Sequence, residues 1–385
     1  MVEFAVWAYP WDLLDEGVEQ VAGRLAEIGV TEVTLATNYH TTHTFHPHNP
    51  ERRTFFARPS AYFQPDGDYG RLEPVVNETM GERDWLAEIA DALADTGVDL
   101  SSWTIGCHNS RLGRRNPDLA IETPHGDPLW FGLCPSKPAV QQYLTALLAD
   151  LDDRAPFRRI ELETFDYFYG TGFGWHHRKF HTRLGDLGEF LLGLCFCEDC
   201  RAHAADAGVD VETARATARA TIDALAEGDL PPDVEEAGWL LENPAVLDYA
   251  TARTETLTAL FADLDAAVDD ADLGYYVGHF GVESSWKHGA DLDALAEHVD
   301  YYAALSYGSD RAEATSYVDT ARAMTDVPIT AGLLPGHPLI HDEATVVDVV
   351  EGFVDRGADR VSFYNYGLLP ERNLDWIGAA TAPYR

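Results

Sequence analysis

Short apolar runs rich in β-branched and aromatic residues alternate along the chain with longer amphipathic stretches. Runs typical of strands lie at residues 3–8, 32–37, 100–106, 158–164, 273–279, 301–307, 327–332 and 359–365. Stretches with helical periodicity lie between them, for example at 83–96, 138–152, 251–269, 312–325 and 343–356. Several helical stretches close with a glycine just before the next strand, which is typical of a helix C-cap. The pattern predicts successive βα units with parallel strands.

Eight such strands and their connections predict an α/β fold, a single (β/α)8 barrel over residues 1–385. Two connections are far longer than a barrel needs: residues 38–80 after the second strand and residues 165–250 after the fourth. Both follow the carboxyl ends of strands, where barrel enzymes build their sites, so we expect functional insertions there. The alternative is that they only decorate the barrel or join copies of the chain into a homo-oligomer.

The amino-acid composition indicates the size of the core and the solvent in which the protein works. The chain has 385 residues, 46% of them hydrophobic, which is ample for a large core. Its 65 acidic residues outnumber its 27 basic ones, for a net charge of −38. Because binding to nucleic acid needs a concentrated basic footprint, this balance excludes a nucleic-acid-binding protein. The spread acidity, with only Lys137, Lys179 and Lys287 as lysines, predicts a halophilic protein that works in concentrated salt.

The amino-terminal segment and the absence of long apolar runs bear on location. The segment MVEFAVWAYPWDLLDEG has neither the basic start nor the apolar centre of a secretory signal. No stretch approaches the ~18 consecutive apolar residues of a membrane span. We therefore expect a cytoplasmic protein with no membrane partner.

Three of the five cysteines crowd into a C-x-C-x2-C motif formed by Cys195, Cys197 and Cys200. In a reducing compartment such crowding indicates a metal site rather than disulfides. Four thiolates close a tetrahedral zinc site, and the fourth is either Cys134 or Cys107. With all four positions filled, the zinc would be structural. The alternative is a set of free thiols packed as small apolar groups.

The order of these features resembles a known family. A Cys-Pro-x-x-Pro segment, a helix, an acidic strand end, an aromatic-rich loop and the C-x-C-x2-C motif follow one another over residues 130–205. This order resembles glycoside hydrolase family 42, the β-galactosidases, and related glycoside-hydrolase-like barrels. The resemblance implies that Cys134 joins Cys195, Cys197 and Cys200 around zinc. It thus places a zinc cluster and helices in the insertion at 165–250.

The fourth strand carries two acidic residues, Glu161 and Glu163, on the same side of the chain. Since strand side chains alternate, both face the barrel interior while Ile160 and Leu162 face the helices. The resemblance makes Glu163 the general acid/base, although Leu162 stands where the family has Asn. A Glu in a confined aromatic mouth has a raised pKa, which suits a general acid. For the deeper Glu161 a structural pairing is expected.

A glycosidase of this type needs a second carboxylate. The family places it at the end of the seventh strand, but residues 329–336 contain no acid. The substitutes are acidic residues that follow later or neighbouring strands: Glu283, Asp310 and Glu371.

Other strand ends are polar or aromatic, a composition that favours sugar binding through stacking and hydrogen bonds to hydroxyls. The candidate substrate-binding residues are Trp7, His40, His108, Asn109, Tyr167, His177, His279, Tyr307 and Asn365. An anionic sugar such as a hexuronate would explain Arg and His retained in so negative a chain. These features together predict an enzyme that acts on an intracellular glycan or glycoside by carboxylate acid/base catalysis.

Two other functions stay open at this point. The first is a metal-dependent sugar or sugar-phosphate isomerase or epimerase, in which several histidines join Glu163 around a catalytic metal of the kind that isomerase and endonuclease barrels hold. Its candidate ligands are His40, His43, His46, His48 and His279. The second is a barrel with a decayed site that binds carbohydrate without turning it over, which the missing acid on the seventh strand favours.

Overall fold

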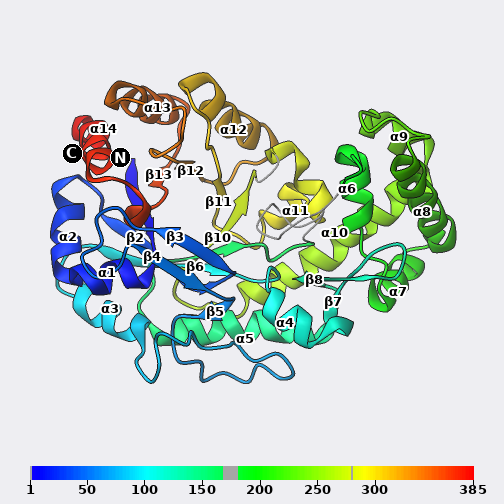
Figure 1. Ribbon diagram of the computed structural model, residues 1–385, viewed down its shortest axis with the longest axis horizontal. Coiled ribbons are helices and arrows are strands. Elements are labelled where there is room, and N and C mark those ends of the chain that lie inside the picture. The colour runs from blue at the N-terminus through cyan, green and yellow to red at the C-terminus, as the bar shows by residue number, and fades with distance from the viewer. Residues whose placement is uncertain (1, 168–180, 279–280) are drawn as a thin grey trace.

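The computed structural model describes residues 2–167, 181–278 and 281–385. Eight parallel strands form one closed barrel, because the first strand pairs with both the second and the last (Figure 1). The strands are β1 (Glu3–Ala8), β2 (Glu32–Tyr39), β6 (Asp99–Ile105), β9 (Arg159–Glu163), β10 (Asp272–Val277), β11 (Tyr301–Ala304), β12 (Ile329–Leu333) and β13 (Arg360–Phe363). The predicted (β/α)8 barrel is confirmed, and the strand bounds differ from the predicted ones by at most a few residues.

Helices cover the outside of the barrel and bury the apolar face of each strand. They are α1 (Pro10–Glu16), α2 (Val18–Glu27), α3 (Trp85–Leu93), α5 (Pro138–Arg154), α10 (Pro244–Asp265), α11 (Leu292–Leu295), α12 (Arg311–Met324), α13 (Glu343–Asp355) and α14 (Glu371–Thr381). Asp84, Asp310 and Asp342 each cap the start of a helix by accepting a hydrogen bond from a backbone N–H. Nearly every strand residue is buried, as expected when helices cover a parallel sheet.

Helix α10 begins earlier than the sequence pattern predicts. It starts at Pro244 rather than near residue 251, because Pro244 occupies the first turn, where a missing N–H costs nothing. The helix therefore connects the segment that follows β9 to the outer surface of the barrel.

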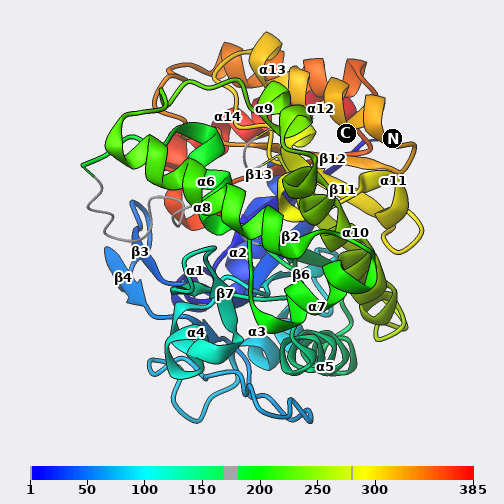
Figure 2. The same cartoon turned by 90° about the vertical axis from the view of Figure 1, so that its right-hand side faces the viewer.

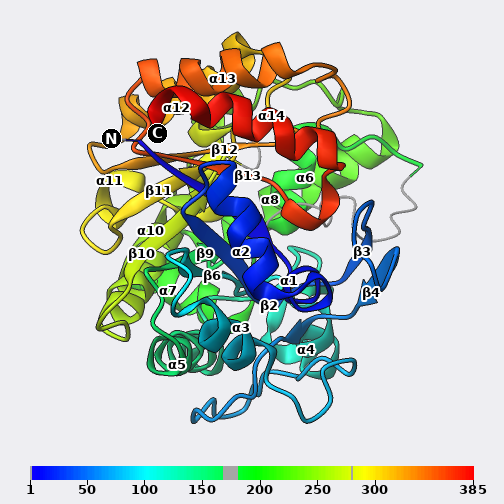
Figure 3. The same cartoon turned by 90° about the vertical axis from the view of Figure 1, so that its left-hand side faces the viewer.

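The segment between β2 and α3 contains the hairpin of β3 (Thr42–Phe45) and β4 (Thr54–Ala57), followed by β5 (Ser60–Ala61). The hairpin stands away from the helical ring (Figure 3). After β6 come α4 (Ser110–Arg115), the short helix η1 (Pro117–Leu119) and the hairpin of β7 (Ala120–Glu122) and β8 (Pro128–Leu133). Both segments follow carboxyl ends of strands and so border the mouth of the barrel.

Between β9 and α10 the chain forms a helical lobe at one side of the barrel (Figure 2). Its helices are α6 (Gly185–Gly193), α7 (Glu198–Asp206), α8 (Val211–Glu227) and α9 (Glu236–Glu242). The two ends of the chain lie close together beside α14 (Figures 1 and 3). Among the described residues, no helix combines the length and apolar character needed to cross a membrane.

Candidate active site and cysteine cluster

Strand β9 places Glu161 and Glu163 inside the barrel, with 0% and 9% of their surface exposed. Glu161 lies deeper and is fully engaged by donors from other strands. The Arg360 guanidinium pairs with it, and Trp7 Nε1 donates to its Oε2 at 2.9 Å. The hydroxyls of Tyr276 and Tyr301 also donate to this carboxylate. Glu161 is therefore part of a structural ion pair that links opposite strands of the barrel.

Glu163 occupies the layer above, toward the carboxyl ends of the strands. Trp103 Nε1 donates to its Oε2 at 2.5 Å. Burial raises its pKa to about 7, and the nearby negative charges of Asp166 and Glu161 act in the same direction, while the Trp103 hydrogen bond opposes them. A carboxyl group with such a pKa holds a proton near neutral pH and can donate it, as a general acid must.

Asp166 is a second buried carboxylate near Glu163, and the sequence analysis did not single it out. It is 2% exposed and follows Glu163 by three residues, just beyond the end of β9. The Tyr275 hydroxyl donates to its Oδ2 at 2.5 Å, and His288 Nδ1 lies 3.2 Å from its Oδ1. The only signal in the sequence was that an acidic residue closely follows the strand that carries Glu163. In a chain with so many acidic residues, this signal is easy to overlook.

Aromatic rings line the barrel interior around Glu163. Trp103 packs against Tyr39 and Trp7, and the Tyr9 and Tyr364 hydroxyl oxygens are 3.2 Å apart. The pKa of each of these tyrosines is raised by burial, so their hydroxyls stay protonated. The resulting surface combines flat apolar faces with hydroxyl groups, which suits a sugar ring.

Several predicted substrate-binding residues lie in or beside this aromatic surface. Trp7 belongs to it, and the Tyr307 ring lies 5.8 Å from that of Tyr364. The rings of His40 and His108 are in contact, with centroids 4.7 Å apart. Asn365 is fully buried, and its Nδ2 has no hydrogen-bond partner among the described residues. Two further predicted residues, His177 and His279, lie outside the described residues.

Two predicted binding residues have structural roles elsewhere instead. Tyr167 is 1% exposed, lies under the Arg253 guanidinium at 4.9 Å, and shares a hydrogen bond of 2.5 Å with Ser136 beside the cysteine cluster. Asn109 caps α4, because its Oδ1 accepts from the Leu112 N–H at 3.0 Å. Both follow strand ends as predicted, and their side chains make these contacts with Arg253 and Ser136 and with the first turn of α4.

The predicted second carboxylates lie on the surface. Glu283 is exposed on the short helix η2 (Val282–His288). Asp310 is exposed and caps α12 through the N–H of Glu313. Glu371 is exposed in the first turn of α14, 3.7 Å from Arg24. No described contact joins any of the three to Glu163, because each is several residues beyond its strand on a segment that has turned outward.

Three of the five histidines considered as catalytic metal ligands have contacts elsewhere. His46 pairs with the buried Asp12 at 2.8 Å, and its Nε2 accepts from Trp11 Nε1. His48 pairs with Glu16 at 2.9 Å. His43 lies on the outlying hairpin, in β3. These three side chains therefore do not lie around Glu163, whereas His40 lies beside the aromatic surface and His279 falls outside the described residues.

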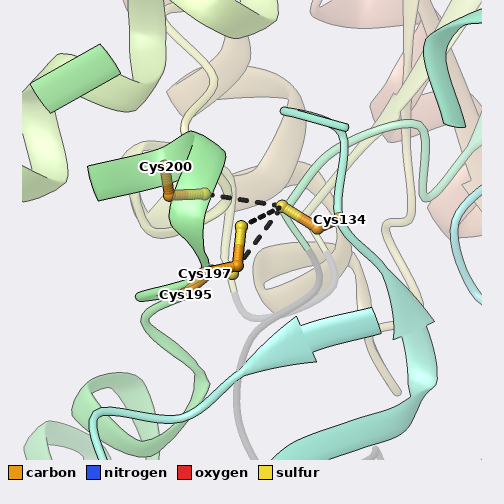
Figure 4. Close-up of side chains that lie close together, drawn as sticks. All are labelled: Cys134, Cys195, Cys197 and Cys200. Atoms are coloured by element: carbon orange, nitrogen blue, oxygen red, sulfur yellow. Dashed lines mark hydrogen bonds between the residues drawn. The ribbon is translucent and has the colours of Figure 1, made fainter. Parts of the chain in front are cut away.

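The four cysteines of the motif and the upstream loop form one buried cluster (Figure 4). Cys134 Sγ lies 3.6, 3.8 and 3.4 Å from the sulfurs of Cys195, Cys197 and Cys200, respectively. Sulfurs at the corners of a tetrahedron with Zn–S distances of about 2.3 Å would be about 3.8 Å apart, so the cluster could hold a metal ion of that kind. Cys107 is buried outside the cluster, which identifies Cys134 as the fourth member.

The cluster joins the helical lobe to the barrel. Cys134 follows β8 in the loop before α5, whereas Cys195, Cys197 and Cys200 lie just before and within α7. The Glu122 N–H of β7 donates to Cys195 Sγ at 3.3 Å, and Lys137 pairs with Asp199 at 2.6 Å next to the sulfurs. Donors and a cation around thiolates are the surroundings expected of a metal site.

Comparisons with known proteins show what this fold is similar to. No protein-family model matches the chain, and no curated protein matches its sequence. In structure, the chain is similar to the PgaB (BpsB) glycoside hydrolase domain from Bordetella bronchiseptica, with a TM-score of 0.59 and 13% identity over 99% of this chain and 98% of that one.

It is also similar to β-galactosidases from the psychrophilic Marinomonas ef1 and the Antarctic haloarchaeon Halorubrum lacusprofundi. Their TM-scores are 0.60 and 0.58, with 14% and 15% identity over 99% of this chain. The chain spans 59% and 58% of the length of these two galactosidases. At such identities the likeness shows the fold, and it confirms the resemblance to glycoside-hydrolase barrels without singling out one family.

Proposed function

We propose that this protein is a glycoside-hydrolase-like enzyme that acts on an intracellular glycan or glycoside. The observation that carries the proposal is Glu163, a buried carboxyl group inside an aromatic barrel mouth, with a pKa raised to about 7. The similarity in fold to solved glycoside hydrolases supports the proposed function by analogy.

In the proposed reaction, Glu163 donates a proton to the glycosidic oxygen as the bond to the leaving group breaks. The positive charge that develops on the sugar ring is stabilised by the negative field of the site. Asp166 contributes to that field and is held in place by Tyr275 and His288. Water then adds to the anomeric carbon and gives up a proton, which restores the proton on Glu163, so one glycosidic C–O bond is broken and one C–O bond to water is formed.

The replacement of Glu163 by Gln tests the proposal. Glu163→Gln should lower kcat/KM on chromogenic aryl glycosides by at least about 100-fold, because general acid catalysis contributes roughly that much. Its thermal midpoint should stay at or above that of the parent, since the amide can still accept from Trp103 and no buried charge is left behind. Activities would be measured on a panel of galactosides, glucosides, fucosides and glucuronides.

The matched control is Glu297→Gln, which alters an exposed carboxylate far along the chain and should leave activity unchanged. A Glu163→Gln protein with parental activity, or one that unfolds at a much lower temperature, would contradict the catalytic role and make Glu163 a structural residue.

The finer parts of the proposal concern the metal and the environment. We propose that the cysteine cluster holds a structural zinc ion, for which its donor set and spacing are suited. The excess of acidic side chains and the unpaired state of all five cysteines fit the cytoplasm of a cell that accumulates salt.

One observation favours a second candidate, a carbohydrate-binding barrel that has lost activity. Strand β12 carries no acid between Ile329 and Leu333, where the related family has its nucleophile. Binding of oligosaccharides to a glycan array, with no turnover of the same compounds by the parent protein, would support this candidate over the enzyme.

A further inference from the structure

One surface pocket is strongly basic although the chain carries 65 acidic residues against 27 basic ones. The pocket has a volume of about 620 Å³, and the described residues that line it include no acid. The polar groups in its wall are Thr41, Arg58, Ser110, Arg111, Arg114 and Arg115. Four guanidinium groups around one cavity repel one another unless an anion lies between them. The arrangement therefore indicates a binding site for an anion.

The arginines of this pocket keep donors available. Arg58, Arg114 and Arg115 are exposed, and no described carboxylate forms an ion pair with them. Arg111 is more buried, and its Nη2 donates to Glu78 at 2.9 Å. Its Nη1 is shielded from solvent and has no hydrogen-bond partner among the described residues. A buried guanidinium donor without a partner is costly, which points to a ligand that completes it.

A row of rings in contact runs from Glu163 toward residues that adjoin this pocket. Trp103, which donates to Glu163, begins the row. The rings are those of Trp103, Tyr39, His40 and His108, with centroids 4.5, 4.3 and 4.7 Å apart in that order; the first pair meets edge to face and the other two pairs are tilted, so the rings are in contact without being stacked face to face. The pocket residue Thr41 directly follows His40, and Ser110 lies two residues after His108. The far end of this row is thus one residue from Thr41 and two residues from Ser110 in the wall of the pocket, which connects the pocket to Glu163 through neighbouring residues.

An exposed aromatic residue flanks the pocket as well. Trp130 on β8 has 48% of its surface exposed, and the Arg114 guanidinium lies 5.9 Å from its ring centroid. Because a large exposed ring is costly in water, Trp130 is suited to stack on a sugar face beside the charged group.

We propose that the arginine pocket binds an oxyanionic substituent, a carboxylate or a sulfate ester, carried by a sugar unit of the glycan that reaches Glu163. This inference rests on the proposed function for the identity of the ligand as a glycan. Guanidinium groups bind either oxyanion through paired N–H donors, which gives geometric specificity in addition to charge. The pocket thereby makes the enzyme selective for acidic over neutral glycans.

The test is isothermal titration calorimetry on the Glu163→Gln protein, in which bound oligosaccharides stay intact. The probes are tetragalacturonic acid, a sulfated galactotetraose, unmodified galactotetraose and sodium sulfate. We expect at least one acidic tetrasaccharide to bind about tenfold or more tightly than the neutral one, since each charged hydrogen bond is worth about that factor. The acidic probe that binds more tightly identifies the substituent.

Variants assign that preference to the pocket. Arg114→Ala and Arg115→Ala should each weaken binding of the acidic probe about tenfold and leave binding of the neutral probe unchanged. The matched control is Arg372→Ala on α14, which removes another exposed guanidinium placed 5.9 Å from a tryptophan ring, that of Trp376. This control should bind all probes like its parent.

The inference would be overturned by equal affinity for neutral and acidic probes, or by sodium sulfate that binds as tightly as the sulfated tetrasaccharide. Acidic binding that survives both arginine replacements would do so as well. Because the binding test needs no turnover, it is separable from the proposed function. If the parent protein binds the acidic probe through the arginines but hydrolyses none of the probes, the proposed hydrolase function is refuted. The inference that the arginine pocket binds an acidic glycan then still holds.

Discussion

The chemistry of Glu163 is decided by its immediate surroundings. An exposed Glu has a pKa of about 4.5 and is ionised at neutral pH, whereas burial and the charges of Asp166 and Glu161 bring this one to about 7. The two glutamates of β9 are separated by one residue, and the deeper one, Glu161, pairs with Arg360. Glu161 and Glu163 thus lie in neighbouring layers of the barrel interior, but the first has a structural role and the second can exchange a proton.

The pH dependence of activity follows from this pKa. As general acid, Glu163 must be protonated, so kcat/KM should be maintained below roughly pH 7 and fall as the pH rises through the pKa. Asp166→Asn removes a nearby negative charge and lowers the pKa of Glu163, so the fall should move to lower pH. The measurement is kcat/KM against pH for both proteins. An unmoved profile in the variant would show that Asp166 does not act on Glu163.

Stability should change with pH in the opposite sense to a salt-bridged carboxylate. The folded state holds the proton on Glu163 between about pH 4.5 and 7, so the parent loses stability relative to Glu163→Gln as the pH rises through that window. From the shift of the pKa, the difference above pH 7 is on the order of 3 kcal/mol. Thermal or denaturant unfolding of both proteins at several pH values measures it.

At the scale of elements, the cysteine cluster determines how the helical lobe attaches to the barrel. Cys134 lies in the loop between β8 and α5, and the other three cysteines lie at the start of α7. Without a bound metal, the sulfurs alone would provide little to hold α7 against the β7–β8 hairpin. Tyr167 and Arg253 pack beside the cluster, so the lobe connects through it to the end of β9.

Removal of the metal should therefore loosen the lobe before the barrel. Elemental analysis of purified protein should give one zinc per chain, and Cys197→Ser should lose it, because three thiolates bind zinc more weakly than four. Limited proteolysis of that variant should cut within α6–α9 while the barrel strands stay protected. Cys107→Ser is the matched control, since Cys107 is buried outside the cluster, and it should keep its zinc. Zinc-free parent protein with an intact lobe would contradict the assignment.

At the scale of the whole molecule, the distribution of charge differs between surface and interior. The net charge of −38 is spread over the exterior, whereas the base of the barrel interior contains a balanced set of cations and carboxylates. Arg360 on the last strand pairs with Glu32 on the second and Glu161 on the fourth among the barrel strands. This arginine therefore connects strands across the barrel in addition to the hydrogen bonds between neighbours.

Replacement of Arg360 should destabilise the closed barrel strongly. Arg360→Met leaves Glu161 buried without its cation, and the loss of one partner of a buried pair costs about 3–5 kcal/mol. The free energy of unfolding in urea at constant salt would measure it. Arg322→Met removes the half-exposed pair with Asp359 and should cost less than about 1 kcal/mol. Equal effects of the two replacements would show that the interior pair does not stabilise the barrel.

Local patterns in the sequence predict most of the barrel because strands and helices leave short-range periodicities. The alternation in Ile160–Glu163 predicts which side chains point inward, and the contacts of Glu161 agree with it. The same local reasoning does not foresee the contacts of Tyr167 with Ser136 and of Asn109 with Leu112, since a residue just beyond a strand can turn to either side. It also overlooks Asp166, because in a chain with 65 acids one more acidic residue carries little information.

The sequence by itself determines the order of strands and helices, the inward side of β9 and the cysteine motif, because each depends on residues that are neighbours in the chain. Tertiary structure alone decides that Cys134 rather than Cys107 completes the cluster, that Glu161 pairs with Arg360, and that the pKa of Glu163 is raised. It also brings Arg58 together with Arg111, Arg114 and Arg115 around one pocket. These outcomes depend on distances and burial between segments far apart in the chain, which no local pattern records.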